Sequence, residues 1–199
     1  TIFLTIFLVS FVLAADVAYV VKTKADPFLT SELGISGLTY KVIYESNVTS
    51  TDFSQYKMLL VGNDNFNNFE NIPAEKYHSL IINQYNSQWG WSLSRGSVSS
   101  PTNIRFNTLN TTIANNVPEV FKAYFIQDIN VNTYYLIGKK ATGIKLIAQI
   151  DGHTSSDSVL AIAYPGTKYL NGKTGQARSL FFGIVEPKYW TPDSRQLFR

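Results

Sequence analysis

The sequence offers one compact group of ionisable side chains that could do chemistry. Asp151, His153 and Asp157 lie in the segment DGHTSSD, directly after the apolar run Ile144–Ile150. Two carboxylates and an imidazole in one loop are groups that metal sites and general acid–base catalysis use. The segment is also rich in the Asp, Gly and Ser of ordinary turns, whose polar side chains bond their own backbone. We favour the turn, and we expect no metal and no catalytic residue here.

Two further groups are candidate ligand contacts. Asp64 follows the apolar run Tyr56–Val61, and open α/β sheets bind ligands at the carboxyl ends of their strands; an Asx turn is the favoured alternative. Tyr85, Trp89 and Trp91 lie in a Ser- and Gly-rich segment, where exposed rings could stack on a sugar or anchor a partner. Large aromatic side chains are buried on average, so we favour a role in covering the core.

Three motifs concern modification, phosphate binding and a turn. Asn47 and Asn110 each begin an Asn-x-Thr sequon, a candidate N-glycosylation site on an exported chain, although we slightly favour two polar turns. Gly166 and Gly172 are separated by five residues, whereas a phosphate loop requires four, so that motif is rejected. Asn171-Gly172 instead predicts the two-residue type I′ turn of a β-hairpin.

Composition narrows the classes of function. Hydrophobic residues make up 45% and charged residues 16% of the 199 residues, which predicts one packed domain. The net charge of +3 comes without a run of Lys or Arg, so nucleic acid is not an expected partner. The chain contains no Cys, which excludes disulfides, thiolate metal sites and a thiol nucleophile.

The first fifteen residues predict export. Ile2–Ala15 is an uncharged apolar run that ends in small residues, as a secretory signal peptide does. It is shorter than the ~20 residues that span a bilayer, so a membrane anchor is the less favoured alternative and the only expected link to a membrane. We therefore divide the chain into residues 1–15, a signal peptide or anchor, and residues 16–199, a single domain.

The remaining pattern alternates strands with helices and then becomes rich in strands. Helices are expected to begin at Asp26-Pro27 and at Pro73, and a final helix at Thr191-Pro192 is expected to be cut off at Arg199. Residues 85–103 predict a long loop. Parallel strands are predicted at Val17–Lys22, Tyr40–Tyr44, Tyr56–Val61 and Ser79–Asn83. Antiparallel strands are predicted at Val120–Ile126, Tyr134–Ile137, Ile144–Ile150, Val159–Ala163 and Ser179–Ile184.

This order of elements, with the late segments Arg178–Gly183 (RSLFFG) and Trp190–Phe198 (WTPDSRQLF), resembles the class I glutamine amidotransferase-like superfamily, above all its trehalose-utilisation (ThuA-like) branch. The resemblance spans roughly Val17–Phe198. It implies a three-layer, flavodoxin-like α/β domain with a parallel first half and antiparallel strands added in the second half.

The resemblance also implies a Cys on a tight strand-to-helix turn, with a His and a Glu supplied late in the chain. This chain has no Cys, and residues 81–91, which correspond to that turn, read IINQYNSQWGW. A Gly-x-Ser-x-Gly turn, which could carry a serine nucleophile instead, is absent from the sequence. We therefore expect no glutaminase activity.

Together these observations predict a domain that binds rather than catalyses. We expect a non-catalytic extracytoplasmic domain, secreted or anchored at the cell surface, that binds a cell-envelope protein or glycan or serves envelope architecture, without a cofactor. One alternative is a carbohydrate-active or other hydrolase that uses Asp64, Asp151, His153 and Asp157. Another is a subunit of a surface filament, in which residues 2–15 form a buried helix.

Overall fold

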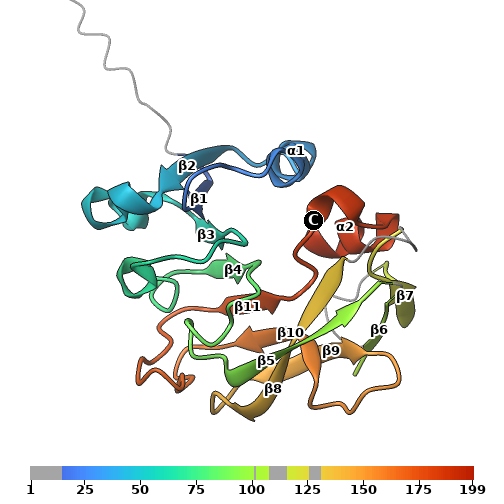
Figure 1. Cartoon of the computed structure of the whole chain (residues 1–199). Helices are drawn as coiled ribbons and strands as arrows, with labels where there is room; N and C mark the ends of the chain where they lie inside the picture. Colours follow the sequence, from blue (N-terminus) through green and yellow to red (C-terminus); the bar gives the residue numbers. More distant parts are fainter. Residues whose placement is uncertain (1–14, 101, 108–115, 126–130) are drawn as a thin grey trace, which may run out of the picture.

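A computed structural model describes residues 15–100, 102–107, 116–125 and 131–199 (Figure 1). A single mixed sheet of eleven strands organises this part of the chain. The strands are β1 (Val17–Val21), β2 (Tyr40–Tyr44), β3 (Met58–Val61), β4 (Ser79–Ile81), β5 (Ser92–Ser99), β6 (Asn103–Phe106), β7 (Val120–Lys122), β8 (Asn132–Lys140), β9 (Lys145–Ile150), β10 (Ser158–Ala163) and β11 (Ser179–Phe182). Their order is β2-β1-β3-β4-β11-β10-β9-β6-β7, and β8 pairs with both β10 and β5.

The pairing changes direction halfway through the sheet. β1 runs parallel to β2 and β3, β3 to β4, and β4 to β11. The pairs made by β5 to β10 among themselves, and the pair of β10 with β11, are antiparallel. This confirms the predicted α/β class, with a parallel first half and antiparallel strands added later. All five residues of β1 are buried, as expected where both faces of a parallel strand are covered.

The two faces of the sheet are covered differently. On one face lie α1 (Pro27–Ile35) and α2 (Pro192–Phe198) (Figure 1). Their buried leucines belong to one core cluster with Val17, Tyr19 and Val21 of β1. On the other face, the short 3-10 helices η1 (Glu45–Ser50), η2 (Phe53–Gln55) and η3 (Phe69–Asn71) and several aromatic side chains pack against Ala18 and Val20. The helix expected from Pro73 is a turn, because too few residues separate Pro73 from β4 to complete a helix.

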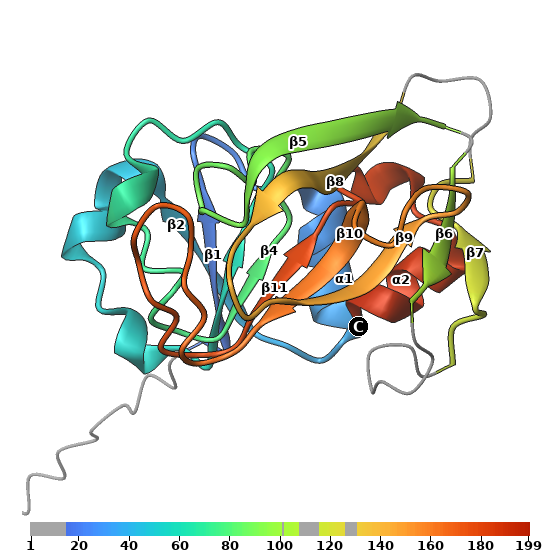
Figure 2. The ribbon, with the colours of Figure 1, turned by 90° about the horizontal axis from the view of Figure 1, so that it is seen from below.

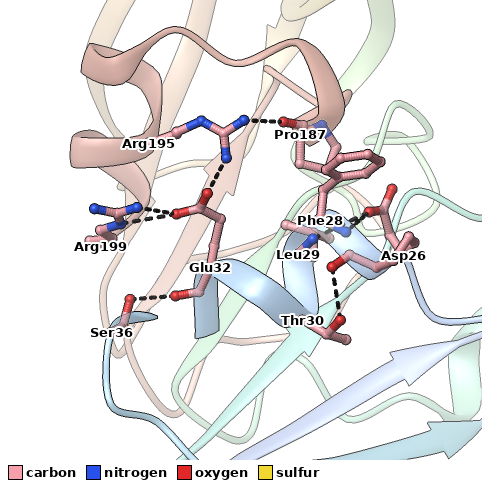
Figure 3. Close-up of polar contacts among 10 residues, drawn as sticks. Asp26, Phe28, Leu29, Thr30, Glu32, Ser36, Pro187, Arg195 and Arg199 are labelled. Carbon is pink, nitrogen blue, oxygen red and sulfur yellow. Dashed lines mark hydrogen bonds and ion pairs between the residues drawn. The ribbon is translucent and has the colours of Figure 1, made fainter. Parts of the chain in front are cut away.

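Capping and an ion cluster fix the two α-helices. Asp26 begins α1 as predicted, since its Oδ1 accepts hydrogen bonds from the backbone N–H groups of Phe28 at 2.7 Å and Leu29 at 3.2 Å. Glu32 of α1 is only 1% exposed, and its two carboxylate oxygens pair with Arg195 and Arg199 (Figure 3). The C-terminal end of α2 is therefore tied to α1.

The predicted loop at residues 85–103 is wrong for its second half and holds for residues 85–91. Residues 92–99 form β5, which lies beside β8 along its whole length (Figure 2). Most side chains of β5 are exposed, so the strand lacks the apolar alternation that marks a half-buried strand. At Gly96 a Cβ atom would lie 2.1 Å from Cζ of Tyr135, so the Tyr135 ring covers this glycine. The four residues of β6 were missed as well.

Two glycine positions explain local sequence features. In RSLFFG, a Cβ on Gly183 would lie 1.9 Å from the backbone oxygen of Tyr134, so the close crossing of β8 requires glycine there. A hairpin at Asn171-Gly172 is confirmed, because Lys168 and Thr174 form an antiparallel bridge around it, although this bridge lies outside the named strands. Within it, the Gly172 N–H donates to the Tyr169 oxygen at 3.1 Å. Its predicted turn type is wrong: Gly172 has a φ of 84° whereas Asn171 does not have a positive φ, which fits a turn followed by a left-handed glycine rather than type I′.

Candidate functional site

A cleft of about 330 Å³ lies at the carboxyl ends of β1 and β3. The loop after β1 supplies Lys24 and Asp26, the loop after β3 supplies Asn63 and Asp64, and the segment after β11 supplies Glu186. These three strands run in the same direction, so the loops that follow them meet at one edge of the sheet. Open α/β sheets bind ligands at this edge. The structure thus places Asp64 beside a cleft and adds residues that the sequence did not single out.

The three carboxylates of this cleft differ in the hydrogen bonds that they accept from the protein. Asp26 uses Oδ1 to cap α1, and Asp64 Oδ2 accepts a hydrogen bond from the Lys22 backbone N–H at 2.9 Å. Glu186 is partly buried, and within the described residues no hydrogen bond or ion pair holds its carboxylate. Burial raises the pKa of the Glu186 carboxyl, and the charge of Asp26 raises it further. Glu186 is therefore the group in the cleft most available to a ligand or a proton.

Tyr19 closes the bottom of the cleft. Its side chain comes from β1 and is 1% exposed, and its hydroxyl oxygen accepts a hydrogen bond from the Asp26 backbone N–H at 3.2 Å. Burial raises the pKa of the Tyr19 hydroxyl above its ordinary value, so this group stays protonated at neutral pH. The cleft therefore offers mainly oxygen acceptors, together with the ammonium group of Lys24.

Asn83 follows β4, where the resemblance implies a catalytic turn. It is completely buried, and its Nδ2 donates to the backbone oxygens of Gly62 at 2.8 Å and Asp64 at 2.9 Å. Its Oδ1 accepts a hydrogen bond from the Tyr85 N–H at 2.6 Å. Because both ends of the amide are bonded to backbone, Asn83 joins the segments that follow β3 and β4 rather than presenting a reactive group.

The resemblance implies a His and a Glu late in the chain, and this part of the chain has a Glu and a Lys instead. The segment between β11 and α2 carries Glu186 and Lys188 and no His. The two histidines of the sequence, His78 and His153, lie elsewhere. The described residues therefore do not assemble a nucleophile, an imidazole base and an orienting carboxylate at the cleft.

The DGHTSSD residues are bonded to partners of their own. Asp151 Oδ1 accepts a hydrogen bond from Arg105 Nε at 2.7 Å, whereas His153 Nδ1 lies 3.4 Å from Asp157 Oδ2. The His153 ring also packs edge-on against Tyr135. In the part of the chain that the structure describes, no group of three or more His, Cys, Asp or Glu residues is placed to hold a metal ion.

The structure also separates Asp64 from the DGHTSSD segment. Asp64 follows β3 and Asp151 follows β9, and both strands end at the same edge of the sheet. However, β4, β11 and β10 lie between them, so they are four strand spacings apart, about 19 Å along the sheet. The four residues of the hydrolase hypothesis therefore do not form one site.

The aromatic candidates contribute mostly to the core. Trp89 is 6% exposed and Trp91 is fully buried, which confirms the favoured interpretation that these rings cover the core. Trp89 packs edge-on against Phe66. Tyr85 is partly exposed, but the guanidinium group of Arg95 lies 4.9 Å from the centre of its ring. Neither tryptophan provides an exposed surface on which a sugar could stack.

The features that predicted export lie mainly outside the described residues. Asn110 and residues 1–14 belong to the parts that the structure does not describe. Asn47 is described and is exposed on η1. Within the described residues, no helix has the length and apolar character needed to cross a membrane.

Comparison with known proteins finds the fold but no sequence family. No protein-family model matches the sequence, and a search of curated proteins finds no match. A cytoplasmic protein from Salmonella typhimurium superimposes with a TM-score of 0.58 at 10% identity, covering 92% of this chain and 96% of that protein. A GMP synthase-like protein from Thermoplasma acidophilum superimposes with a TM-score of 0.54 at 15% identity, covering 93% of this chain and 91% of that protein.

A ThuA-like protein from Bacteroides uniformis also superimposes, with a TM-score of 0.56 at 8% identity, covering 92% of this chain and 86% of that protein. At such low identities these likenesses concern the fold alone. They agree with the mixed sheet and its parallel first half. The chain thus has an α/β fold of the glutamine amidotransferase type.

Proposed function

We propose that the chain is a non-catalytic, extracytoplasmic binding domain that holds a hydroxyl-rich glycan of the cell envelope in the cleft after β1 and β3. The observation that carries this proposal is the carboxylate of Glu186, which has no partner among the described residues and lines the same cleft as Asp26 and Asp64. Carboxylate oxygens accept hydrogen bonds from hydroxyl groups. A volume of about 330 Å³ suits a small saccharide.

Two observations favour binding over amidotransferase chemistry. The chain has no Cys, and in the stretch that corresponds to the catalytic turn the buried Asn83 has its amide bonded to backbone on both sides. The ThuA-like neighbour and the resemblance of the sequence to the trehalose-utilisation branch support a saccharide as the ligand. The apolar residues 2–15 support an extracytoplasmic location.

A binding titration tests the proposal. The purified protein is titrated with trehalose and with short oligosaccharides of cell-envelope glycans, followed by calorimetry and by NMR. We expect saturable binding that Glu186→Gln weakens by about tenfold, because a charged acceptor of sugar hydroxyls is lost. Glu70→Gln is the matched control, since Glu70 is exposed and lies outside the cleft. Absence of binding to every saccharide, or equal loss in both variants, would contradict the proposal.

A glutamine hydrolysis assay tests the non-catalytic part separately. We expect no ammonia release above the buffer blank, because the chain offers no thiol nucleophile. Hydrolysis that follows the protein through purification would show a catalytic role that this interpretation does not contain.

A hydrolase remains the second candidate, and one observation favours it. Burial raises the pKa of the Glu186 carboxyl, and a carboxyl group with a raised pKa is suited to general acid catalysis. Turnover of chromogenic glycosides that Glu186→Gln abolishes and Glu70→Gln preserves would favour the hydrolase over the binding domain.

A further inference from the structure

Two motifs of the sequence that are far apart in the chain pack against each other. The loop of residues 86–91 contains Trp89 and Trp91, and it contacts the Asn171-Gly172 hairpin. The Leu170 N–H donates to the Gly90 oxygen at 2.9 Å. Gly90 has a φ of 73°, and a Cβ on it would lie 2.9 Å from atoms of Asn171. The loop and the hairpin are therefore in close contact at this junction.

A small cavity lies at the junction. Its volume is about 10 Å³, which is close to the minimum that holds one water molecule. The loop contributes Gln88, Trp89 and Trp91 to its lining, and the hairpin contributes Tyr169 and Lys173. An ion pair between Lys173 Nζ and Glu75 Oε1, at 3.3 Å, adds to the wall.

Three buried polar atoms belong to residues that line this cavity. They are Nε1 of Trp89, Nε1 of Trp91 and Oε1 of Gln88, and none of them has a hydrogen-bond partner within the described residues. The large majority of buried donors and acceptors in native structures have a hydrogen-bond partner, from the protein or from ordered water. Nδ2 of Asn86 and Oγ1 of Thr133 are also unpaired, but these two residues do not line the cavity.

The three atoms match the hydrogen-bonding capacity of one water molecule. A water molecule in the cavity would accept hydrogen bonds from the two indole N–H groups and donate one to the Gln88 carbonyl oxygen. A monatomic anion would accept from the indoles, but it has no proton to donate to the Gln88 carbonyl oxygen. A larger ligand exceeds the volume.

We propose that one ordered water molecule is an integral part of this junction, bound by the indole N–H groups of Trp89 and Trp91 and by the Gln88 side chain. Buried waters with three hydrogen bonds are retained as parts of the fold. This water would bridge residues of the loop that lies against the hairpin. The inference is independent of the ligand proposed for the cleft, because the two sites share no residue.

NMR cross-relaxation between water and the indole protons tests the proposal, and the chain supplies its own control. The sequence has three Trp residues. The third, Trp190, is 1% exposed, but its Nε1 donates to the Ile184 backbone oxygen at 2.9 Å. We expect water cross-peaks of the sign typical of long-lived bound water at the indole protons of Trp89 and Trp91, and none at Trp190. Absence of the cross-peak at either Trp89 or Trp91 overturns the bridging water.

Two sets of variants make the result unambiguous. Trp89→Phe and Trp91→Phe should each remove one indole signal and so assign the cross-peaks, and an unchanged Trp190 signal reports a folded chain. Tyr169→Phe removes the exchangeable hydroxyl of a residue that lines the cavity, so cross-peaks that persist arise from water, whereas cross-peaks that vanish arise from the hydroxyl and overturn the proposal. Should a variant fail to fold, a crystal structure of the unaltered protein decides by density within about 3 Å of both Nε1 atoms.

Discussion

The junction between α1 and α2 and the cleft after β1 and β3 each contain a glutamate removed from bulk water, and the protein treats the two in opposite ways. Glu32 is 1% exposed, and both of its carboxylate oxygens are bound by arginines (Figure 3). Glu186 lies in the segment that enters η5 (Pro187–Tyr189), which contacts α1, and its carboxylate has no hydrogen-bond or ion-pair partner within the described residues.

The difference between the two glutamates distinguishes a structural carboxylate from a candidate functional one. Arg195 donates to the Pro187 backbone oxygen, at 3.5 Å, as well as to Glu32. The Arg195 guanidinium group thus contacts Pro187, the residue next to Glu186, yet it forms its ion pair with Glu32. A carboxyl group that stays unpaired at the cost of a raised pKa, in a cleft at the carboxyl edge of the sheet, is a candidate for binding or catalysis.

Removing both arginines should produce the largest effect. In the double variant Arg195→Met and Arg199→Met, Glu32 remains buried without a counter-charge, and the free energy of unfolding should fall by about 3–5 kcal/mol. Urea denaturation followed by tryptophan fluorescence measures this loss. If the double variant were as stable as the unaltered protein, Glu32 would not depend on its partners and the contrast with Glu186 would disappear.

A triple variant supplies the control for that experiment. Adding Glu32→Leu to the double variant removes the stranded charge and replaces the whole ion cluster with apolar side chains. Replacement of buried ion clusters in this way is often neutral or stabilising, so we expect most of the lost stability to return. A triple variant no more stable than the double would assign the loss to packing of the arginine side chains instead.

A substitution at Glu186 should change stability in the opposite direction and raise it. Because the pKa of its carboxyl is raised above the ordinary value of 4.5 in the folded state, the folded protein binds more protons than the unfolded chain as pH rises through and above that value. Stability therefore falls with rising pH over this window. Glu186→Gln removes this titration, so the variant should gain stability relative to the unaltered protein as pH rises from 4 to 7.

Denaturation midpoints at several pH values measure this difference, with Glu70→Gln as the exposed control. A difference between Glu186→Gln and the unaltered protein that stays constant from pH 4 to pH 7 would show that the carboxyl titrates normally. Glu186 would then resemble a solvated surface group, and the comparison with Glu32 would lose its functional meaning.

The parts of the fold that sequence reasoning predicted are those with local signals. β1, β2 and α1 were predicted correctly because apolar runs and the Asp26-Pro27 cap indicate them within a few residues. β5 was missed because it is a polar ribbon paired with β8, and its side chains do not alternate between core and solvent. A strand that is stabilised by backbone pairing leaves little trace in its side-chain pattern.

The candidate site was only partly predictable for a similar reason. Asp64 was found from the rule that ligands bind after parallel strands, but Glu186 was not, although it follows the predicted strand Ser179–Ile184 in the same way. The missing information was that β11 lies beside β4 and parallel to it, a pairing between strands far apart in the sequence. Only this pairing brings Glu186 to the edge where Asp64 lies.

The smallest effect is expected at Asp151, whose partner is exposed. The Asp151 and Arg105 side chains remain 30% and 42% exposed, and solvent screens such a pair, so it contributes little to stability. Asp151→Asn keeps an oxygen that can accept from Arg105, and we expect a denaturation midpoint within experimental error of the unaltered protein and no change in saccharide binding. Repeating the measurement in high salt should leave the two proteins equal. A loss of binding in Asp151→Asn with unchanged stability would instead extend the site across the sheet to the DGHTSSD segment. In that case a carboxylate with an ion-pair partner, Asp151, would contribute to binding as well, and the lack of a partner would no longer distinguish Glu186.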